Sequence, residues 1–161
     1  MERVPLTSYG YAMLQAELTE RISIRRPSII KAIEEARGHG DLKENAEYHA
    51  AKEEQGLNEA RISDLESKLG RAEVFDPTKL SGKKVTLGAT LKLIDVNTDE
   101  TLNYILVGPD ESNLEKGLIS TTSPIGRALL GKNEGDEATL NAPSGKRVFE
   151  IAKVEYKAIA M

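Results

Sequence analysis

The strongest constraint on the fold is a helical pattern that stops, reverses and starts again around residues 38–48. Before this break, apolar or compatible residues recur with the spacing of a helix that is buried along one stripe. They are Leu14, Leu18, Ile22, Ile29, Ile33 and Ala36. After the break, the same spacing returns at Ile62, Leu65, Leu69 and Ala72. The pattern predicts two antiparallel helices, the first ending near Arg37 and the second running from about Leu42 to Glu73.

Local residues support this hairpin. Thr7 or Ser8 is a suitable N-cap for the first helix. Pro27 removes a backbone hydrogen bond and disfavours helical geometry at the preceding residue, so we expect a kink or short break there. Gly38 and Gly40 supply the backbone freedom that a tight reversal requires. With about thirty residues per arm at roughly 1.5 Å each, the tip would lie about 45 Å from the open end.

Beyond Asp76 and Pro77 the periodicity changes from that of a helix to that of strands. Ser123 can cap a short helix, Pro124 suits its first position and Gly131 suits its end. The sequence therefore predicts an α+β protein whose second half is a small antiparallel sheet with one short helix. The strand-like segments, separated by turn residues, are 85–96, 101–107, 137–141 and 147–156.

Length and composition favour two small domains. The chain has 161 residues with 39% hydrophobic content, and an extended hairpin has little core of its own. We expect a hairpin over 1–76 with its tip at about 38–46, a linker over 77–84 and a compact domain over 85–161. The absence of cysteine excludes disulfides and thiolate metal sites. No apolar run reaches the roughly 20 residues of a membrane span, so we expect a soluble, cytoplasmic protein.

The charge is concentrated where the helical pattern reverses. The whole chain has 22 basic and 26 acidic residues, a formal charge of -4. Residues 34–54 alone carry seven acids against three bases, which is the same imbalance. Such a segment repels phosphates unless a cation intervenes. We therefore expect the hairpin tip to meet a metal ion or a basic protein rather than bare nucleic acid.

Two acids at this tip have two interpretations. Asp41 and Glu44 have the spacing of a capping box, in which both side chains serve the start of the second helix. A carboxylate held at a helix end also offers its second oxygen to a cation, so the cap does not exclude metal binding. Asn45 and Tyr48 are expected to orient the tip, and stacking of Tyr48 on a base is the less favoured alternative. Nothing in the sequence pairs His39 or His49 with other metal ligands, so neither receives a role.

Two motifs resemble those of the bacterial Gre transcript cleavage factors. Residues 40–48 resemble the tip motif of that family, and residues 120–132 resemble its second signature. The Arg25-Arg26-Pro27 segment and the closing Val154-Glu155-Tyr156 are similar to the A-type members. The likeness covers nearly the whole chain in one collinear order, and the two motifs fall in different predicted domains.

The resemblance implies a factor that binds bacterial RNA polymerase and inserts its hairpin tip through the secondary channel. There it would stimulate the polymerase's own Mg²⁺-dependent cleavage of the 3′ end of backtracked RNA, with no turnover when alone. Asp41 and Glu44 would hold the second Mg²⁺ and position the attacking water. That ion would be shared with the polymerase, and the isolated protein would hold neither a metal nor another cofactor.

The resemblance also implies two contact regions. Arg37, Lys43 and Lys52 resemble a basic patch that would face the RNA 3′ end, although each could be ordinary solvated helix surface. A lysine at position 52 cannot make the forked phosphate contact of an arginine. The second signature would grip a coiled coil at the channel rim, or it could be a plain strand-to-helix connection. Its residues are Ser120, Thr121, Thr122, Ser123, Pro124 and Ile125. The C-terminal domain would be FKBP-like, and the isolated protein a monomer.

Two other functions stay open at this stage. The first is a secondary-channel regulator without cleavage activity, which is disfavoured because both tip acids are present. The second is an FKBP-like chaperone or prolyl isomerase. The latter is disfavoured because a fold does not carry an activity, and because 4% aromatic content without tryptophan leaves little for a proline pocket.

Overall fold

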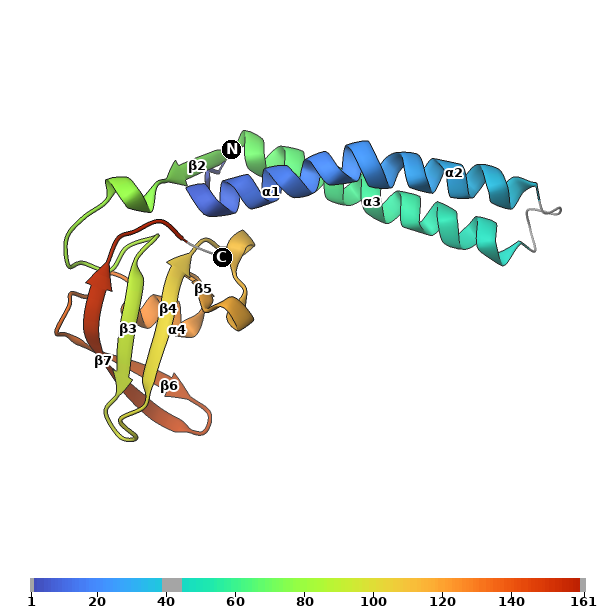
Figure 1. Ribbon diagram of the computed structural model, residues 1–161. Coiled ribbons are helices and arrows are strands. Elements are labelled where there is room, and N and C mark those ends of the chain that lie inside the picture. The colour runs from blue at the N-terminus through green and yellow to red at the C-terminus, as the bar shows by residue number, and fades with distance from the viewer. Residues whose placement is uncertain (1, 39–44, 160–161) are drawn as a thin grey trace. The chain divides into compact units, whose positions relative to one another are not determined.

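The computed structural model describes residues 2–38 and 45–159 (Figure 1). Contacts divide the chain into two compact units. One unit contains Ala12–Arg71, and the other combines Arg3–Tyr11 with the chain from Ala72 onward. Residues 3–11 thus belong with the sheet rather than with the hairpin helices. The described helices include none that is long and apolar enough to cross a bilayer.

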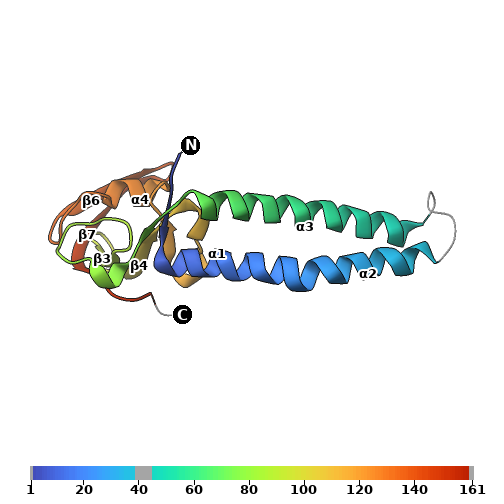
Figure 2. The same cartoon turned by 90° about the horizontal axis from the view of Figure 1, so that it is seen from above.

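Most of the predicted helical hairpin forms the first unit, and only residues 8–11 of its first arm group with the sheet. Its first arm consists of α1 (Ser8–Glu20), a π turn (Arg21–Arg25) and α2 (Arg26–Arg37). Its second arm is α3 (Ala46–Gly70), which returns alongside the first (Figure 2). The seam is apolar because each arm presents one buried stripe. Its buried members are Leu14, Ile29, Ile33, Ala36, Ala51, Ile62 and Leu65.

Near Pro27, where we expected a kink or short break, the first arm contains a π turn. The Arg26 N–H donates to the carbonyl of Arg21, five residues back. A proline inside an α-helix would clash with the carbonyl four residues earlier, and a π turn relieves that crowding without ending the helix. The turn also moves Ile22 out of the predicted stripe, since its side chain is 37% exposed.

The second arm begins later than predicted. Asn45 has an extended backbone and its side chain accepts from the Tyr48 N–H, so it is the N-cap of α3. The predicted start at Leu42 was therefore wrong. The predicted end at Glu73 was also wrong, because the chain leaves the helix at Gly70 and forms the strand β2 (Ala72–Phe75).

The strand β2 pairs in parallel with β1 (Val4–Thr7), from Val4 opposite Ala72 to Thr7 opposite Phe75. Neither strand was predicted, because four residues are too few to show a period of two. The pairing joins the start of the first arm to the residues that follow the second arm.

The main sheet has five strands in the order β5-β4-β3-β7-β6. Neighbouring strands are antiparallel except for the parallel pair β4–β5. One face packs on α4 (Pro124–Leu129) around Phe149, Leu91 and Leu106, so the α+β class is confirmed. The strands are β3 (Thr90–Asp95), β4 (Thr101–Val107), β5 (Leu118–Ser120), β6 (Glu137–Ala142) and β7 (Gly145–Glu155).

The short helix follows its sequence signals. Ser123 accepts from the Gly126 N–H as N-cap, Pro124 is the first residue of α4, and Gly131 has a φ of 86° just beyond the end. The predicted strand from residue 85 instead begins at Thr90, because Gly88 has a φ of 96° and turns the chain before it.

Candidate functional site

The three predicted tip residues Asp41, Lys43 and Glu44 lie outside the described residues, as does His39. The structure describes the chain on either side of them, where α2 ends at Arg37 and α3 begins at Ala46. We call these two helix ends the frame, because they are the described parts of the chain that flank the predicted site.

One side chain bridges this frame. The Asn45 Nδ2 donates to the carbonyl of Ala36 in the last turn of α2, at 2.6 Å. Its Oδ1 accepts from the Tyr48 N–H in the first turn of α3, at 3.1 Å. A helix leaves carbonyls unpaired at its end and N–H groups unpaired at its start, so one amide satisfies both kinds of group. Asn45 therefore ties together the two helix ends that flank residues 39–44.

Tyr48 is the second residue of this frame. Its side chain packs against the buried cluster of Ile29, Ile33 and Ala51 in the hairpin seam. Its ring also makes an edge contact with His49, with 5.5 Å between the ring centroids. The packing gives Tyr48 a structural role in the seam, next to the Asn45 bridge. Among the described residues no three histidine or acidic side chains gather in a way that would hold a metal ion.

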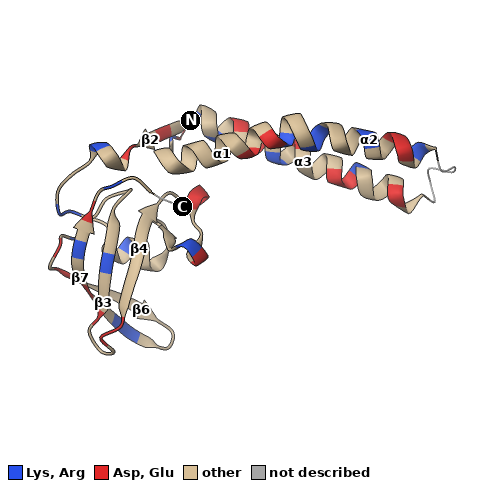
Figure 3. Cartoon of the chain, in the orientation of Figure 1, with Lys and Arg blue, Asp and Glu red and all other residues tan. Residues whose placement is uncertain are grey.

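Two of the predicted basic residues are described, and both are exposed at this end of the hairpin. Arg37 is the last residue of α2, and Lys52 lies in α3 with its Nζ donating to Gln55 at 3.1 Å. Acidic residues surround them along both arms (Figure 3). Acidic and basic side chains are mixed at this end of the hairpin. Any contact with RNA must therefore be made by individual basic side chains rather than by a continuous basic surface.

The Arg25-Arg26-Pro27 segment has structural partners. Arg26 forms a two-bond ion pair with Glu59 of α3, at 2.9 and 2.8 Å, and Arg25 pairs with Glu20 at 2.8 Å. The buried Asn58 donates to the Arg21 carbonyl in the π turn at 3.3 Å and accepts from the Arg21 guanidinium at 3.0 Å. These contacts fix the π turn against α3.

A carboxylate one turn earlier joins the same network. Glu17 accepts from Arg21 at 2.8 Å and from Arg61 of α3 at 2.9 Å. The hydrogen bonds and charge of Arg61, with a smaller contribution from Arg21, lower the pKa of Glu17 to about 2. The carboxylate is therefore charged at neutral pH and holds the two arms together.

The second signature forms a hydrogen-bonded turn between β5 and α4. The Ser120 hydroxyl contacts the Thr122 hydroxyl at 2.7 Å, and the Ser123 hydroxyl donates to the Ser120 carbonyl at 2.7 Å. A Cβ on Gly126 would lie 2.0 Å from that carbonyl, so glycine is required there. Thr122 and Pro124 are exposed, whereas Ser120, Thr121, Ser123 and Ile125 are partly covered. The turn presents a small, fixed surface made by residues with local structural roles.

Sequence reasoning missed one buried acid. Glu111 accepts from the Gly108 N–H and the Thr7 N–H, both at 2.9 Å, and also from the Thr7 hydroxyl. Burial raises the pKa of Glu111, against the lowering effect of these donors. A Cβ on Gly10 would lie 1.9 Å from its Oε1. Glu111 thereby fixes the start of α1 to the turn after β4. In the sequence only Gly10 and Gly108, which leave room for its carboxylate, hint at this contact.

The sequence matches two family models in succession. Residues 4–74 match the N-terminal domain of the transcription elongation factors, and residues 80–156 match the C-terminal domain of GreA/GreB. The chain belongs to the GreA/GreB family of transcription elongation factors. The family predicted from the tip motif and the second signature is thus confirmed, and the chain is similar to its members over both halves.

Curated relatives are similar to this chain over nearly their whole length. The transcription elongation factor GreA of Hyphomonas neptunium is 58% identical over 157 residues, covering 98% of this chain and 100% of that protein. The GreA of Rhodopseudomonas palustris is 54% identical, with 98% of each chain covered. Among solved structures, Gfh1 of Thermus thermophilus is 34% identical and covers 96% of this chain and 99% of its own, with a TM-score of 0.44.

Proposed function

We propose that this chain binds bacterial RNA polymerase and inserts the free end of its hairpin through the secondary channel to the active centre. There it stimulates the polymerase's own cleavage of the 3′ end of backtracked RNA and so rescues arrested complexes. The observation that carries the proposal is the match of both halves to the GreA/GreB family together with the presence of both tip acids, Asp41 and Glu44.

The chemistry explains why a factor would bring carboxylates. Hydrolysis of a phosphodiester at a two-metal centre needs two ions and an oriented water, and Mg²⁺ takes oxygen ligands at about 2.0–2.1 Å. In a backtracked complex no incoming triphosphate supplies such oxygens. Asp41 and Glu44 are hard oxygen donors that suit Mg²⁺, so they would hold the second ion and orient the water. The polymerase remains the catalyst, and this chain completes its site.

The hairpin supplies the support for those acids. Asn45 bonds both helix ends that flank residues 39–44, and Tyr48 is anchored in the seam beside it. Donors that are held in place by their supporting structure lose less free energy to ordering when a metal or substrate arrives. Arg37, Lys43 and Lys52 would contact the phosphates of the extruded RNA from the same end of the hairpin.

The sheet unit would provide affinity for polymerase. Its hydrogen-bonded turn from Ser120 to Ile125 exposes Thr122 and Pro124, which would contact the coiled coil at the channel rim. Because the two contacts are on different units, cleavage and binding should be separable by mutation.

Transcript cleavage by stalled, backtracked elongation complexes in the presence of Mg²⁺ tests the proposal. The wild-type protein should release short fragments from the RNA 3′ side. Asp41→Asn and Glu44→Gln keep the side-chain size but remove a charged ligand, so the rate should fall by about 10²-fold or more. Glu53→Gln, an exposed acid in α3, is the matched control and should keep the wild-type rate.

Binding must be measured in the same experiment. The two tip variants should compete with wild-type protein for polymerase as well as the control does. If wild-type protein binds polymerase and releases no fragments, the chain is a channel regulator without cleavage activity. If it does not bind polymerase, the whole proposal fails.

A further inference from the structure

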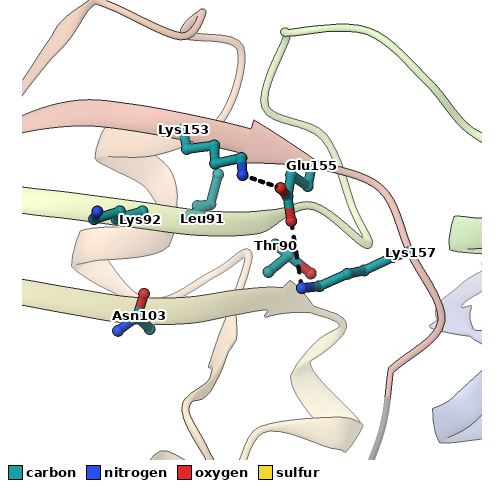
Figure 4. Close-up of a pocket in the computed structure, with 7 residues that line it drawn as sticks. All are labelled: Thr90, Leu91, Lys92, Asn103, Lys153, Glu155 and Lys157. Atoms are coloured by element: carbon teal, nitrogen blue, oxygen red, sulfur yellow. Dashed lines mark ion pairs between the residues drawn. The ribbon is translucent and has the colours of Figure 1, made fainter.

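Two adjoining hollows lie on the face of the main sheet opposite its core. Along β3, Thr90 and Lys92 alternate with the buried Leu91 and Leu93, so they project to the other face. The hollows have volumes of about 220 and 310 Å³ and share Thr90, Asn103 and Lys157 in their linings. We call the two hollows together the sheet groove, and Figure 4 shows the residues that line the first of them. Its size is in the range of small-molecule sites.

The sheet groove is basic although the chain is acidic. Four lysines line it, Lys92, Lys116, Lys153 and Lys157, against a single carboxylate, Glu155. The formal charge of the lining residues is four minus one, or +3, whereas the whole chain carries -4. A local charge opposite in sign to that of the molecule concentrates anions at this place.

The arrangement of these lysines is unfavourable for the isolated sheet. Lys92 of β3 lies directly opposite Lys153 of β7 in the strand register. Like charges at directly opposed positions destabilise a sheet pair. Glu155 compensates only part of this charge, since it pairs with Lys153 and with Lys157, the latter at 3.3 Å. No described carboxylate forms an ion pair with Lys92 or Lys116.

A hydroxyl group in the same groove lacks a partner. Among the described residues, the Oγ1 atom of Thr90 is buried and makes no hydrogen bond. An unsatisfied buried polar group is costly, and a bound water or ion is one of the explanations for it. In Figure 4 the Lys157 side chain extends across Thr90 toward Glu155. If Lys157 turned toward an anion, the Thr90 hydroxyl would be uncovered and could donate to it.

We propose that the sheet groove binds a multivalent phosphate anion between Lys92 and Lys153, with Lys157 and Lys116 at its sides. Lysine ammonium groups bind phosphate as point charges, and four of them suit a chain of phosphates better than a single carboxylate. The ligand would offset the repulsion between the opposed lysines and satisfy Thr90. This site lies on the sheet unit and is separate from the proposed role of the hairpin tip.

Titration of the full-length protein with inorganic tripolyphosphate, followed by backbone amide NMR without Mg²⁺, tests the site. Saturable shifts should appear at Thr90, Lys92, Asn103 and Lys153. Lys92→Gln and Lys153→Gln should each weaken binding at least about fivefold, whereas Lys146→Gln, an exposed lysine at the start of β7, should not. Shifts that do not saturate, or equal affinities in all four proteins, would overturn the proposal.

Thermal unfolding gives a second, independent measurement. Without anion, Lys92→Gln should raise the melting temperature because it removes the opposed charge. Tripolyphosphate should then stabilise wild type and Lys146→Gln but have little effect on Lys92→Gln. Equal stabilisation of all three would mean a general ionic effect and contradict a site. A titration with ATP in place of tripolyphosphate distinguishes two kinds of ligand. Equal affinity for both would identify the phosphate chain as the group that is bound, and tighter binding of ATP would identify a nucleotide.

Discussion

The Asn45 amide donates to the carbonyl of Ala36 at 2.6 Å and thereby joins the end of α2 to the start of α3. The same side chain caps α3 through the Tyr48 N–H. The two bonds have different requirements, because the cap needs an acceptor and the bridge needs a donor. A pair of substitutions can therefore separate them.

Asn45→Asp should keep the cap and lose the bridge, whereas Asn45→Ala should lose both. Loss of an N-cap costs about 1 kcal/mol, so only the alanine variant should show that loss in the free energy of unfolding and faster amide exchange at Tyr48. If the proposed function is correct, both variants should reach a lower maximal cleavage rate with an unchanged half-maximal concentration. Wild-type cleavage by both variants would show that the bridge is unimportant for the tip.

Gly10→Ala and Gly56→Ala should have opposite effects on stability. A Cβ at Gly10 would lie 1.9 Å from Glu111 Oε1 and displace the carboxylate from its donors, at a cost of about 1–3 kcal/mol. A Cβ at Gly56, inside α3, meets nothing within 4 Å, so alanine should stabilise the helix by about 0.5–1 kcal/mol. Denaturant unfolding of both variants provides the measurement. A stable Gly10→Ala protein would mean that the Glu111 anchor adapts without loss.

Acid should weaken the hairpin through Glu17. Its pKa is about 2 in the folded protein and near 4.5 in the unfolded chain, so the folded state favours the charged form. The stabilisation is therefore present above about 4.5 and is lost as the pH falls through the folded pKa. Glu17→Gln should have a lower free energy of unfolding than wild type at pH 7. This difference in free energy should shrink as the pH falls from about 4.5 to about 2. Helical circular dichroism against urea at several pH values measures this difference, which would stay constant if Glu17 were unimportant.

Gly126→Ala should damage the second signature without affecting the hairpin. The added Cβ would lie 2.0 Å from the Ser120 carbonyl, a backbone atom that cannot move aside as a flexible side chain does. The turn from Ser120 to Ile125 should deform, and polymerase affinity should fall about tenfold or more. Ser112→Ala, at an exposed site elsewhere in this unit, is the control. Unchanged affinity of Gly126→Ala would place the polymerase contact elsewhere.

The sequence contained enough information for the elements with long periodic patterns. Most of the seam, β4 and the capped helix α4 were predictable because local spacing determines them. The buried Ala51 was not predicted, and the prediction of Ala72 in the second helical stripe was wrong, since it lies in β2. The strands β1, β2 and β5 were not, since they have only three or four residues and depend on partners distant in the chain. Ile22 fitted the helical stripe by spacing, and only the π turn places it outside.

Only those parts of the candidate site that are contiguous in the sequence were predictable. The motifs of the tip and of the second signature could be identified because they are contiguous in the sequence. The anchor at Glu111 could not, because its donors come from Thr7 and Gly108 and are assembled only by folding. The same holds for the opposed Lys92 and Lys153, whose relationship depends on the register of β3 and β7.

The π turn at Arg21–Arg25 gives the first arm one residue more than regular helical winding requires. Removing a single residue there, together with Pro27→Ala, would convert the arm into an uninterrupted α-helix and leave Leu14 and Ile33 in phase with the seam. The same deletion inside α3 would rotate Ile62 and Leu65 by about 100° relative to the part of the helix before it. The first arm should therefore accept the loss of one residue at the π turn, whereas α3 offers no such position among its described residues.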